Sequence, residues 1–116
     1  MDTRTTIERY FEQLKAKSGW EASLADDIVF NSFTSPPKEV RGKAAYLEST
    51  KRFYGSIQSM EVRQLTVEGD HAVALTRYRL RGPTGDFTSD VAEAFGVAGG
   101  KINSLGIYFD TAPFPK

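Results

Sequence analysis

Residues 60–110 read MEVRQLTVEGDHAVALTRYRLRGPTGDFTSDVAEAFGVAGGKINSLGIYFD. Apolar and polar residues alternate along this stretch, and glycine-containing breaks interrupt it three times. Alternation with a period of two is typical of β-strands, and short breaks of this kind between such segments are typical of hairpins. The stretch therefore predicts four long antiparallel strands, at residues 60–68, 71–81, 86–97 and 101–110.

The first half of the chain has the apolar spacing of helices. Thr5 and Glu8 match a capping box, which would begin a helix, and Gly19 would end it. Pro36 and Pro37 favour an irregular loop. The elements predicted for this half are a first helix up to residue 18, a short helix at 20–25, a strand at 28–33 and a third helix at about 43–57.

Strands of this length must twist and curl, and three helices are available to fill the concave side of the sheet. The predicted fold class is therefore α+β, with a cone-shaped, strongly curved, mainly antiparallel sheet wrapped around helices. The chain shows no repeat and no linker, so we expect one domain over residues 1–116. The open mouth of such a cone is a natural site for a small hydrophobic molecule.

The composition narrows the classes of function. Fifteen Lys and Arg residues balance fifteen Asp and Glu residues, which argues against a nucleic-acid or membrane-surface partner. There is no Cys and only one His, His71, so we expect no metal site, and no motif indicates a cofactor. No apolar run approaches the length of about 18 residues that a membrane span needs, so we expect a cytoplasmic protein.

Four polar side chains fall on or beside apolar faces: Tyr10, Glu93, Tyr54 and Asp110. Tyr10 lies within the apolar stripe of the first helix, and Glu93 alternates with Phe95 and Val97. If this face of the strand is concave, the Glu93 carboxyl lies in an apolar interior and its pKa is raised. Alternatively, the opposite Ala and Gly face is buried and Glu93 is solvated. Tyr54, on the third helix, can reach the same interior.

The order of elements and several short motifs resemble the nuclear transport factor 2-like superfamily, which includes the ketosteroid isomerases (steroid delta-isomerases) and the SnoaL-like polyketide cyclases. The resemblance spans nearly the whole chain. The motifs that carry it are Glu8-Arg9-Tyr10, Leu24-Ala25-Asp26-Asp27, Arg41-Gly42-Lys43-Ala44-Ala45, Arg52-Phe53-Tyr54 and Gly100-Lys101-Ile102.

The resemblance to ketosteroid isomerases implies roles for individual residues. It implies that Tyr10 and a protonated Glu93 donate hydrogen bonds to a substrate oxygen, with Tyr54 in support. The position of the isomerase base falls on Ser32, preceded by Asn31, and neither side chain accepts a proton as a carboxylate does. The resemblance therefore leaves the base unassigned.

The polyketide cyclases offer a different acid. The chain resembles cyclase-like members through Ile107-Tyr108-Phe109-Asp110, and this implies a catalytic acid at Asp110. Alternation along the strand places Asp110 on the face opposite to Phe109. The residues expected to contact a substrate are Trp20, Phe30, Ser32, Tyr54, Phe95 and Phe109.

Three functions remain open from the sequence. The first is a cofactor-independent isomerase, cyclase or lyase acting on a hydrophobic carbonyl compound. The second is a binding protein without turnover, and the third is an interaction module whose own aromatic residues fill the cavity. The resemblance also implies a homodimer formed through the outer face of the sheet, where exposed Tyr78 or Tyr108 would suit the contact.

Overall fold

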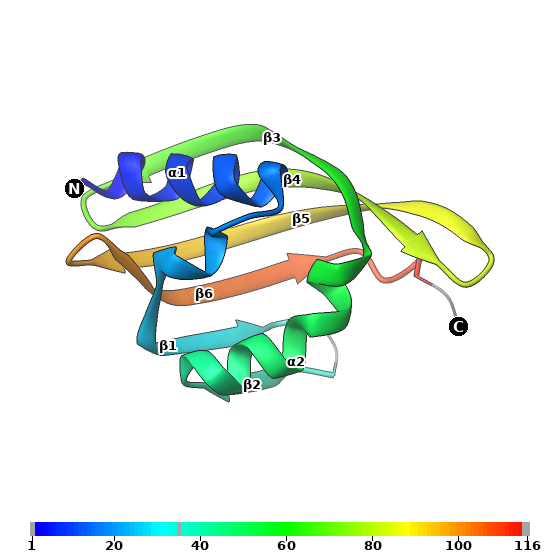
Figure 1. Cartoon of the computed structure of the whole chain (residues 1–116), viewed down its shortest axis with the longest axis horizontal. Coiled ribbons are helices and arrows are strands. Elements are labelled where there is room, and N and C mark those ends of the chain that lie inside the picture. Colours follow the sequence, from blue (N-terminus) through cyan, green and yellow to red (C-terminus); the bar gives the residue numbers. More distant parts are fainter. Residues whose placement is uncertain (1, 35, 115–116) are drawn as a thin grey trace.

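The structure, a computed structural model, describes residues 2–34 and 36–114. A six-stranded sheet carries two α-helices and one short 3-10 helix on its concave side (Figure 1). In chain order the elements are α1 (Thr3–Ala16), η1 (Trp20–Ser23), β1 (Leu24–Ser32), β2 (Lys38–Arg41), α2 (Lys43–Ser56), β3 (Ile57–Glu68), β4 (His71–Gly82), β5 (Gly85–Ala98) and β6 (Lys101–Phe109).

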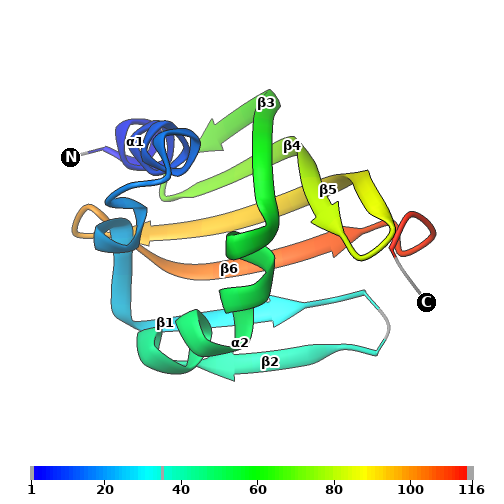
Figure 2. The same cartoon turned by 45° about the vertical axis from the view of Figure 1, so that its right-hand side comes forward.

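The strand order is β2-β1-β6-β5-β4-β3, and the sheet is open at both edges. The strands from β3 to β6 form the three predicted hairpins, whereas β1 pairs with β6 in parallel, so the sheet is mixed. The chain passes from α2 directly into β3 across the concave side (Figure 2). The predicted α+β class with a curved sheet around helices is confirmed.

Several element boundaries differ from the prediction. Helix α1 begins earlier because Asp2, and not Thr5, is its N-cap: Asp2 Oδ1 accepts a hydrogen bond from the Thr5 backbone N–H at 2.7 Å. The short second helix is a 3-10 turn that ends at Ser23, so the strand that follows begins at Leu24 and not at residue 28.

Strand β2 was not predicted, because the two prolines indicated an irregular loop. Its sequence, Lys-Glu-Val-Arg, shows little alternation, and its side chains are mostly exposed. It is an edge strand that pairs only with β1 among the described residues, so its burial imposes almost no pattern on its sequence.

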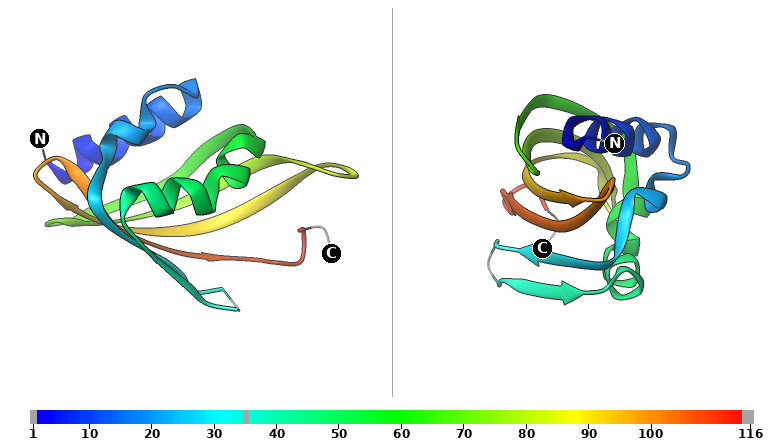
Figure 3. Two further views of the ribbon diagram at one scale, coloured as in Figure 1. Left: turned by 60° about the horizontal axis from the view of Figure 1, so that its bottom comes forward. Right: turned by 90° about the vertical axis from the view of Figure 1, so that its left-hand side faces the viewer.

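Strong curvature gives the sheet two different faces. Both helices lie on the concave side, and the strands curl around them (Figure 3). Along β4 every second residue is buried, from Ala72 to Leu80, and the residues between them are exposed. Tyr78 shares the buried parity, so the prediction that Tyr78 is exposed for a dimer contact is wrong.

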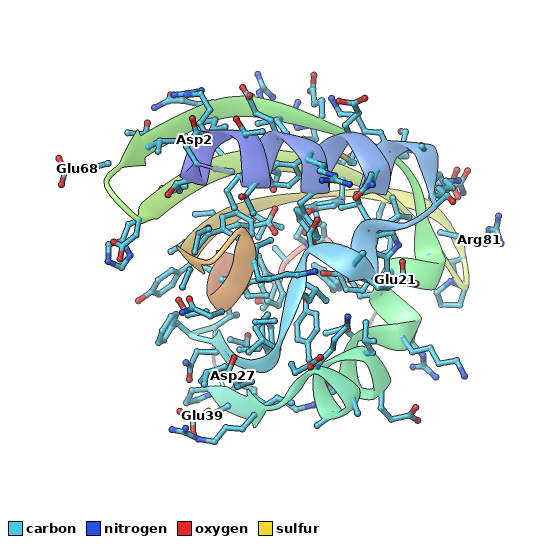
Figure 4. All side chains as sticks on the ribbon, turned by 60° about the vertical axis from the view of Figure 1, so that its left-hand side comes forward. Asp2, Glu21, Asp27, Glu39, Glu68 and Arg81 are labelled. Atoms are coloured by element: carbon cyan, nitrogen blue, oxygen red, sulfur yellow. The ribbon has the colours of Figure 1, made fainter. Side chains whose placement is uncertain are left out.

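The convex face is where all the large exposed apolar side chains of the described residues lie. They are Phe33, Val73, Leu75 and Tyr108. The rings of Phe33 and Tyr108 stack at 5.0 Å over Gly106, where any side chain would collide with the Phe33 ring. Charged side chains such as Glu68 and Arg81 lie at the periphery of the molecule (Figure 4).

Candidate ligand-binding cavity

A cavity of about 260 Å³ lies between the concave face of the sheet and α2. Aromatic rings form much of its wall: Phe30, Tyr46, Phe53, Tyr54, Tyr78, Phe109 and Phe114. The polar side chains that line it are Ser32, Lys38, Ser49, Thr50, Ser89 and Glu93. A mostly apolar cavity with a few polar groups is typical of a site for a small organic molecule.

Glu93 is the one buried carboxylate among the described residues, with 4% of its surface exposed. The Phe95 face of β5 is the concave one, so the alternative in which Glu93 is solvated is wrong. Glu93 Oε2 accepts hydrogen bonds from Thr76 Oγ1 at 2.7 Å and from the Tyr78 hydroxyl at 2.8 Å. Burial raises the pKa of Glu93 to about 7, although these two hydrogen bonds oppose the shift.

The two oxygens of this carboxyl group have different surroundings. Oε2 accepts both hydrogen bonds, and none of the described residues bonds to Oε1. When Glu93 is protonated, the proton is therefore best placed on Oε1, which can donate it to a molecule in the cavity. When Glu93 is ionised, the same oxygen can accept a proton or a hydrogen bond.

Three tyrosine hydroxyls form a chain beside the cavity. The Tyr10 and Tyr54 hydroxyls are 2.8 Å apart, and the Tyr54 hydroxyl also bonds to that of Tyr46. Tyr46 and Tyr54 line the cavity, whereas Tyr10 is fully buried behind them and does not. Burial raises the pKa of all three phenols well above its ordinary value, so they remain neutral near pH 7.

The number of protons on the three tyrosine hydroxyls shows whether one is free to form a hydrogen bond with a ligand. The three hydroxyls carry three protons, and the two hydrogen bonds between them use two. Tyr10 is buried and bonds only to Tyr54 among the described residues, so its proton points to Tyr54. The spare proton therefore belongs to Tyr46 or Tyr54, and either residue presents it to the cavity.

The structure brings together most of the residues expected to contact a substrate. Phe30, Ser32, Tyr54 and Phe109 line the cavity with Glu93. Ser32, on which the resemblance places the isomerase base position, is a hydroxyl residue of the cavity wall.

Other predicted site residues lie outside this cavity. Phe95 packs in the core against Tyr10, with ring centroids 5.9 Å apart. Trp20 stacks on the Tyr54 ring at 4.0 Å, on the side of a separate outer groove. Asp110 is exposed, and its Oδ1 accepts a hydrogen bond from the Ala112 N–H at 3.0 Å. The strand does not twist enough at its end to turn Asp110 inward.

Among the site residues that were not predicted from the sequence are four hydroxyl residues: Tyr46, Thr76, Tyr78 and Ser89. For Tyr78, alternation with the outward arginines of β4 was a usable signal. Thr76 and Ser89 are small hydroxyl residues on apolar faces, which have no sequence signal distinct from ordinary strand residues.

The described residues contain neither a cluster of metal ligands nor a membrane-spanning helix. No group of three or more His, Cys, Asp or Glu side chains there is placed to hold a metal ion. Within the same residues, neither α-helix has the length and apolar character needed to cross a bilayer.

An α+β fold in which a curved sheet and its helices enclose a cavity defines a class of small domains built around an internal pocket. Within that class, the SnoaL-like domain family model matches residues 7–105. The chain belongs to the SnoaL-like domain family.

Solved structures agree with this assignment at the level of the fold. A proposed ketosteroid isomerase from Kribbella flavida DSM 17836 is 22% identical with a TM-score of 0.77, covering 98% of this chain and 82% of its own. A proposed SnoaL-like polyketide cyclase from Jannaschia sp. CCS1 is 18% identical with a TM-score of 0.77, covering 98% and 92%. An NTF2-like protein of unknown function from Cytophaga hutchinsonii ATCC 33406 is 18% identical with a TM-score of 0.76, covering 97% and 94%. No curated protein matches the chain significantly in sequence.

Proposed function

We propose that this protein binds a small hydrophobic molecule through a carbonyl or phenolic oxygen in the cavity. The observation that carries the proposal is the buried Glu93 carboxyl, whose Oε2 is held by Thr76 and Tyr78 while Oε1 receives no hydrogen bond from the described residues. A ligand oxygen at this position would give Oε1 the hydrogen-bond partner that the described residues do not supply.

The ligand oxygen has two donors available. One is the protonated Oε1 of Glu93, and the other is the spare phenolic proton of Tyr46 or Tyr54. This differs from the arrangement that the family resemblance implied, because Tyr10 supports the phenolic donor from behind and does not line the cavity. The apolar walls would contact the body of the ligand.

Binding is tested with 2-acetonaphthone, a neutral ketone that can only accept hydrogen bonds. At a concentration of about 100 Kd, we expect it to stabilise the chain by about 2.7 kcal/mol in thermal unfolding. Its affinity, measured by calorimetry, should weaken as the pH rises above about 7, because Glu93 then loses the donated proton.

The Glu93→Gln variant sharpens this test. Its amide can accept the bonds from Thr76 and Tyr78 and still donate to the ketone at every pH, so binding should persist and lose its pH dependence. The matched control, Glu68→Gln, makes the same change at an exposed position and should keep the native pH profile. A native chain that is not stabilised by 2-acetonaphthone or by 2-naphthol would overturn the proposal.

We infer a second function, proton transfer on a carbonyl compound, from Glu93, the one carboxyl among the described residues that line the cavity. A pKa of about 7 suits a group that both takes and returns protons near neutral pH. Ionised Glu93 would take a proton from the carbon next to a carbonyl, the phenolic donor would stabilise the enolate oxygen, and Glu93 would return the proton to another carbon. Ser32 and Asp110 have no part in this step.

Conversion of 3-cyclohexen-1-one into its conjugated isomer tests the reaction, because the product is followed by its absorbance. We expect the rate to rise with pH through about 7 and to fall by at least about 100-fold in Glu93→Gln, which retains binding but cannot exchange a proton. Native turnover in Glu93→Gln would show that Glu93 does not transfer the proton, and no turnover by the native chain would leave the protein as a binder without this chemistry.

We also propose that the convex face pairs with a second copy of the chain. Phe33, Val73, Leu75 and Tyr108 concentrate the exposed apolar surface of the described residues on this one face. Beside them lie Arg77 and Asp90, whose side chains bond at 2.7 Å. A two-fold axis would place this surface of one copy against the same surface of the other, so that Arg77 of each copy could face Asp90 of its partner.

A further inference from the structure

The Ser89 hydroxyl is buried and unpaired at the cavity wall. Two buried side-chain atoms lack a hydrogen-bond partner among the described residues, Gln13 Oε1 and Ser89 Oγ, and of these only Ser89 belongs to the wall of this cavity. Ser89 is fully buried, on the same concave face of β5 as Glu93. A buried hydroxyl without a partner is unfavourable, and an oxygen of a ligand in the cavity that Ser89 lines would supply that partner.

Ser89 lines the cavity at a different point along β5 from Glu93. The two residues are four positions apart on β5, which separates their Cα atoms by about 13 Å along the strand. The side chains of Tyr78 and Glu93 together bridge this interval, because the Tyr78 backbone pairs with Ser89 while its hydroxyl bonds to Glu93 Oε2. Val91 lies between the two residues on the same face, so the intervening wall is apolar.

Aromatic rings surround the end of the cavity that contains Ser89. Phe114 packs on Phe87 at 5.0 Å and on Phe109 at 5.2 Å between ring centroids, and both Phe109 and Phe114 line the cavity. A charged ligand group would lose its hydration here without an opposite charge from Ser89, so the group that Ser89 meets should be neutral.

We propose that the ligand of this cavity carries a second, neutral hydrogen-bonding oxygen that Ser89 binds, across an apolar body from the oxygen that Glu93 binds. The inference rests on the proposed binding function and adds the class of ligand: a flat molecule of about two rings with a hydroxyl or carbonyl group at each end. Both groups fit because a serine hydroxyl donates one hydrogen bond and accepts others.

Two matched probes test the proposal, 2-naphthol and naphthalene-2,6-diol, which differ by one hydroxyl at the far end of the same ring system. We expect calorimetry to show that the native chain binds the diol about 5- to 10-fold more tightly, the effect of one hydrogen bond to a buried partner. The Ser89→Ala variant should lose most of this preference while its affinity for 2-naphthol is unchanged.

The matched control is Ser59→Ala, the same substitution at an exposed position of β3, which should keep the native preference for the diol. The diol has two equivalent orientations, and this statistical factor cancels when its preference is compared between variants. The melting temperature of Ser89→Ala without ligand should equal or exceed that of the native chain, because the substitution removes an unpaired buried hydroxyl.

The outcomes separate this inference from the function on which it rests. If 2-naphthol binds but the native chain shows no preference for the diol, or if Ser89→Ala keeps that preference, the role of Ser89 is wrong and the binding function stands. If neither compound binds, the proposed function has failed and the inference fails with it.

Discussion

The concave and convex faces of β4 and β5 are made by the same two strands and have opposite characters. On the concave face, apolar residues surround one carboxylic acid, Glu93, that burial perturbs. On the convex face, charged residues surround a few exposed apolar ones, such as Leu75 and Tyr108. The buried acid on the concave face is a candidate ligand site. The exposed apolar residues on the convex face are a candidate contact surface.

The largest effect should come from one substitution made on both faces of a single strand. Leu80 is 1% exposed and Leu75 is 43% exposed, and both lie on β4. We expect Leu80→Ala to lower the free energy of unfolding by about 2–5 kcal/mol, since it leaves a cavity in the core. Leu75→Ala should change the free energy of unfolding of the monomer by about 0.5 kcal/mol or less. Chemical denaturation measures both values, and equal losses would contradict the assignment of the two faces.

The second effect is a pH dependence that belongs to the concave face alone. The pKa of Glu93 rises from 4.5 in the unfolded chain to about 7 on folding, so the unfolded state releases its proton first as the pH increases. Glu93 should therefore lower stability progressively between pH 4.5 and about 7, by on the order of 3 kcal/mol in total, with no further loss above that range.

Denaturation of the native chain and of Glu93→Gln across this range isolates the contribution. The variant should lack this decline, and Glu68→Gln, on the exposed periphery, should follow the native curve. Parallel curves for the native chain and Glu93→Gln would mean that the carboxyl is solvated.

A smaller effect distinguishes the members of the tyrosine chain. Tyr54→Phe leaves the buried Tyr10 hydroxyl without its partner and should cost about 1–3 kcal/mol in unfolding free energy. Tyr10→Phe removes the last hydroxyl of the tyrosine chain without leaving an unpaired group. It should lower the free energy of unfolding by about 1 kcal/mol or less.

Ligand affinity is a second measurement that tests the role of Tyr10. Tyr10→Phe should retain 2-acetonaphthone affinity within a few-fold, because Tyr46 and Tyr54 still hold a spare proton. Abolished ketone binding in a folded Tyr10→Phe protein would show that Tyr10 itself contacts the ligand.

The smallest effect on the fold is expected on the convex face. Tyr108 is 59% exposed, so Tyr108→Lys should change the free energy of unfolding of a monomer by about 0.5 kcal/mol or less. In light scattering at micromolar concentration it should convert a dimer into a monomer, while Arg81→Lys, at the exposed periphery, should leave the dimer intact. A native chain that is already monomeric would remove the proposed pairing.

The alternating pattern of residues 60–110 was sufficient to predict the four hairpin strands, because in each strand one face is more buried than the other. Strand β2 was not predicted because an edge strand with exposed side chains does not need alternating apolar and polar residues. For Glu93 the sequence offered two faces, and the direction in which the sheet curves decides between them, a property set by packing against α1 and α2 and not by local alternation.

The composition of the site was harder to predict than its location. Tyr10 and Tyr54 were expected at the ligand, but the hydroxyl chain extends to Tyr46, and this places the spare proton away from Tyr10. Ser89 becomes a candidate only when the hydrogen-bond partners of every buried oxygen are counted in three dimensions.

The stacking of Trp20 on Tyr54 has a practical consequence. The chain contains one tryptophan, and its ring centroid lies 4.0 Å from that of Tyr54, which also lines the cavity. Indole emission responds to small changes in its surroundings, so the fluorescence of this single residue should report occupancy of the pocket directly, as a built-in optical sensor that needs no attached dye.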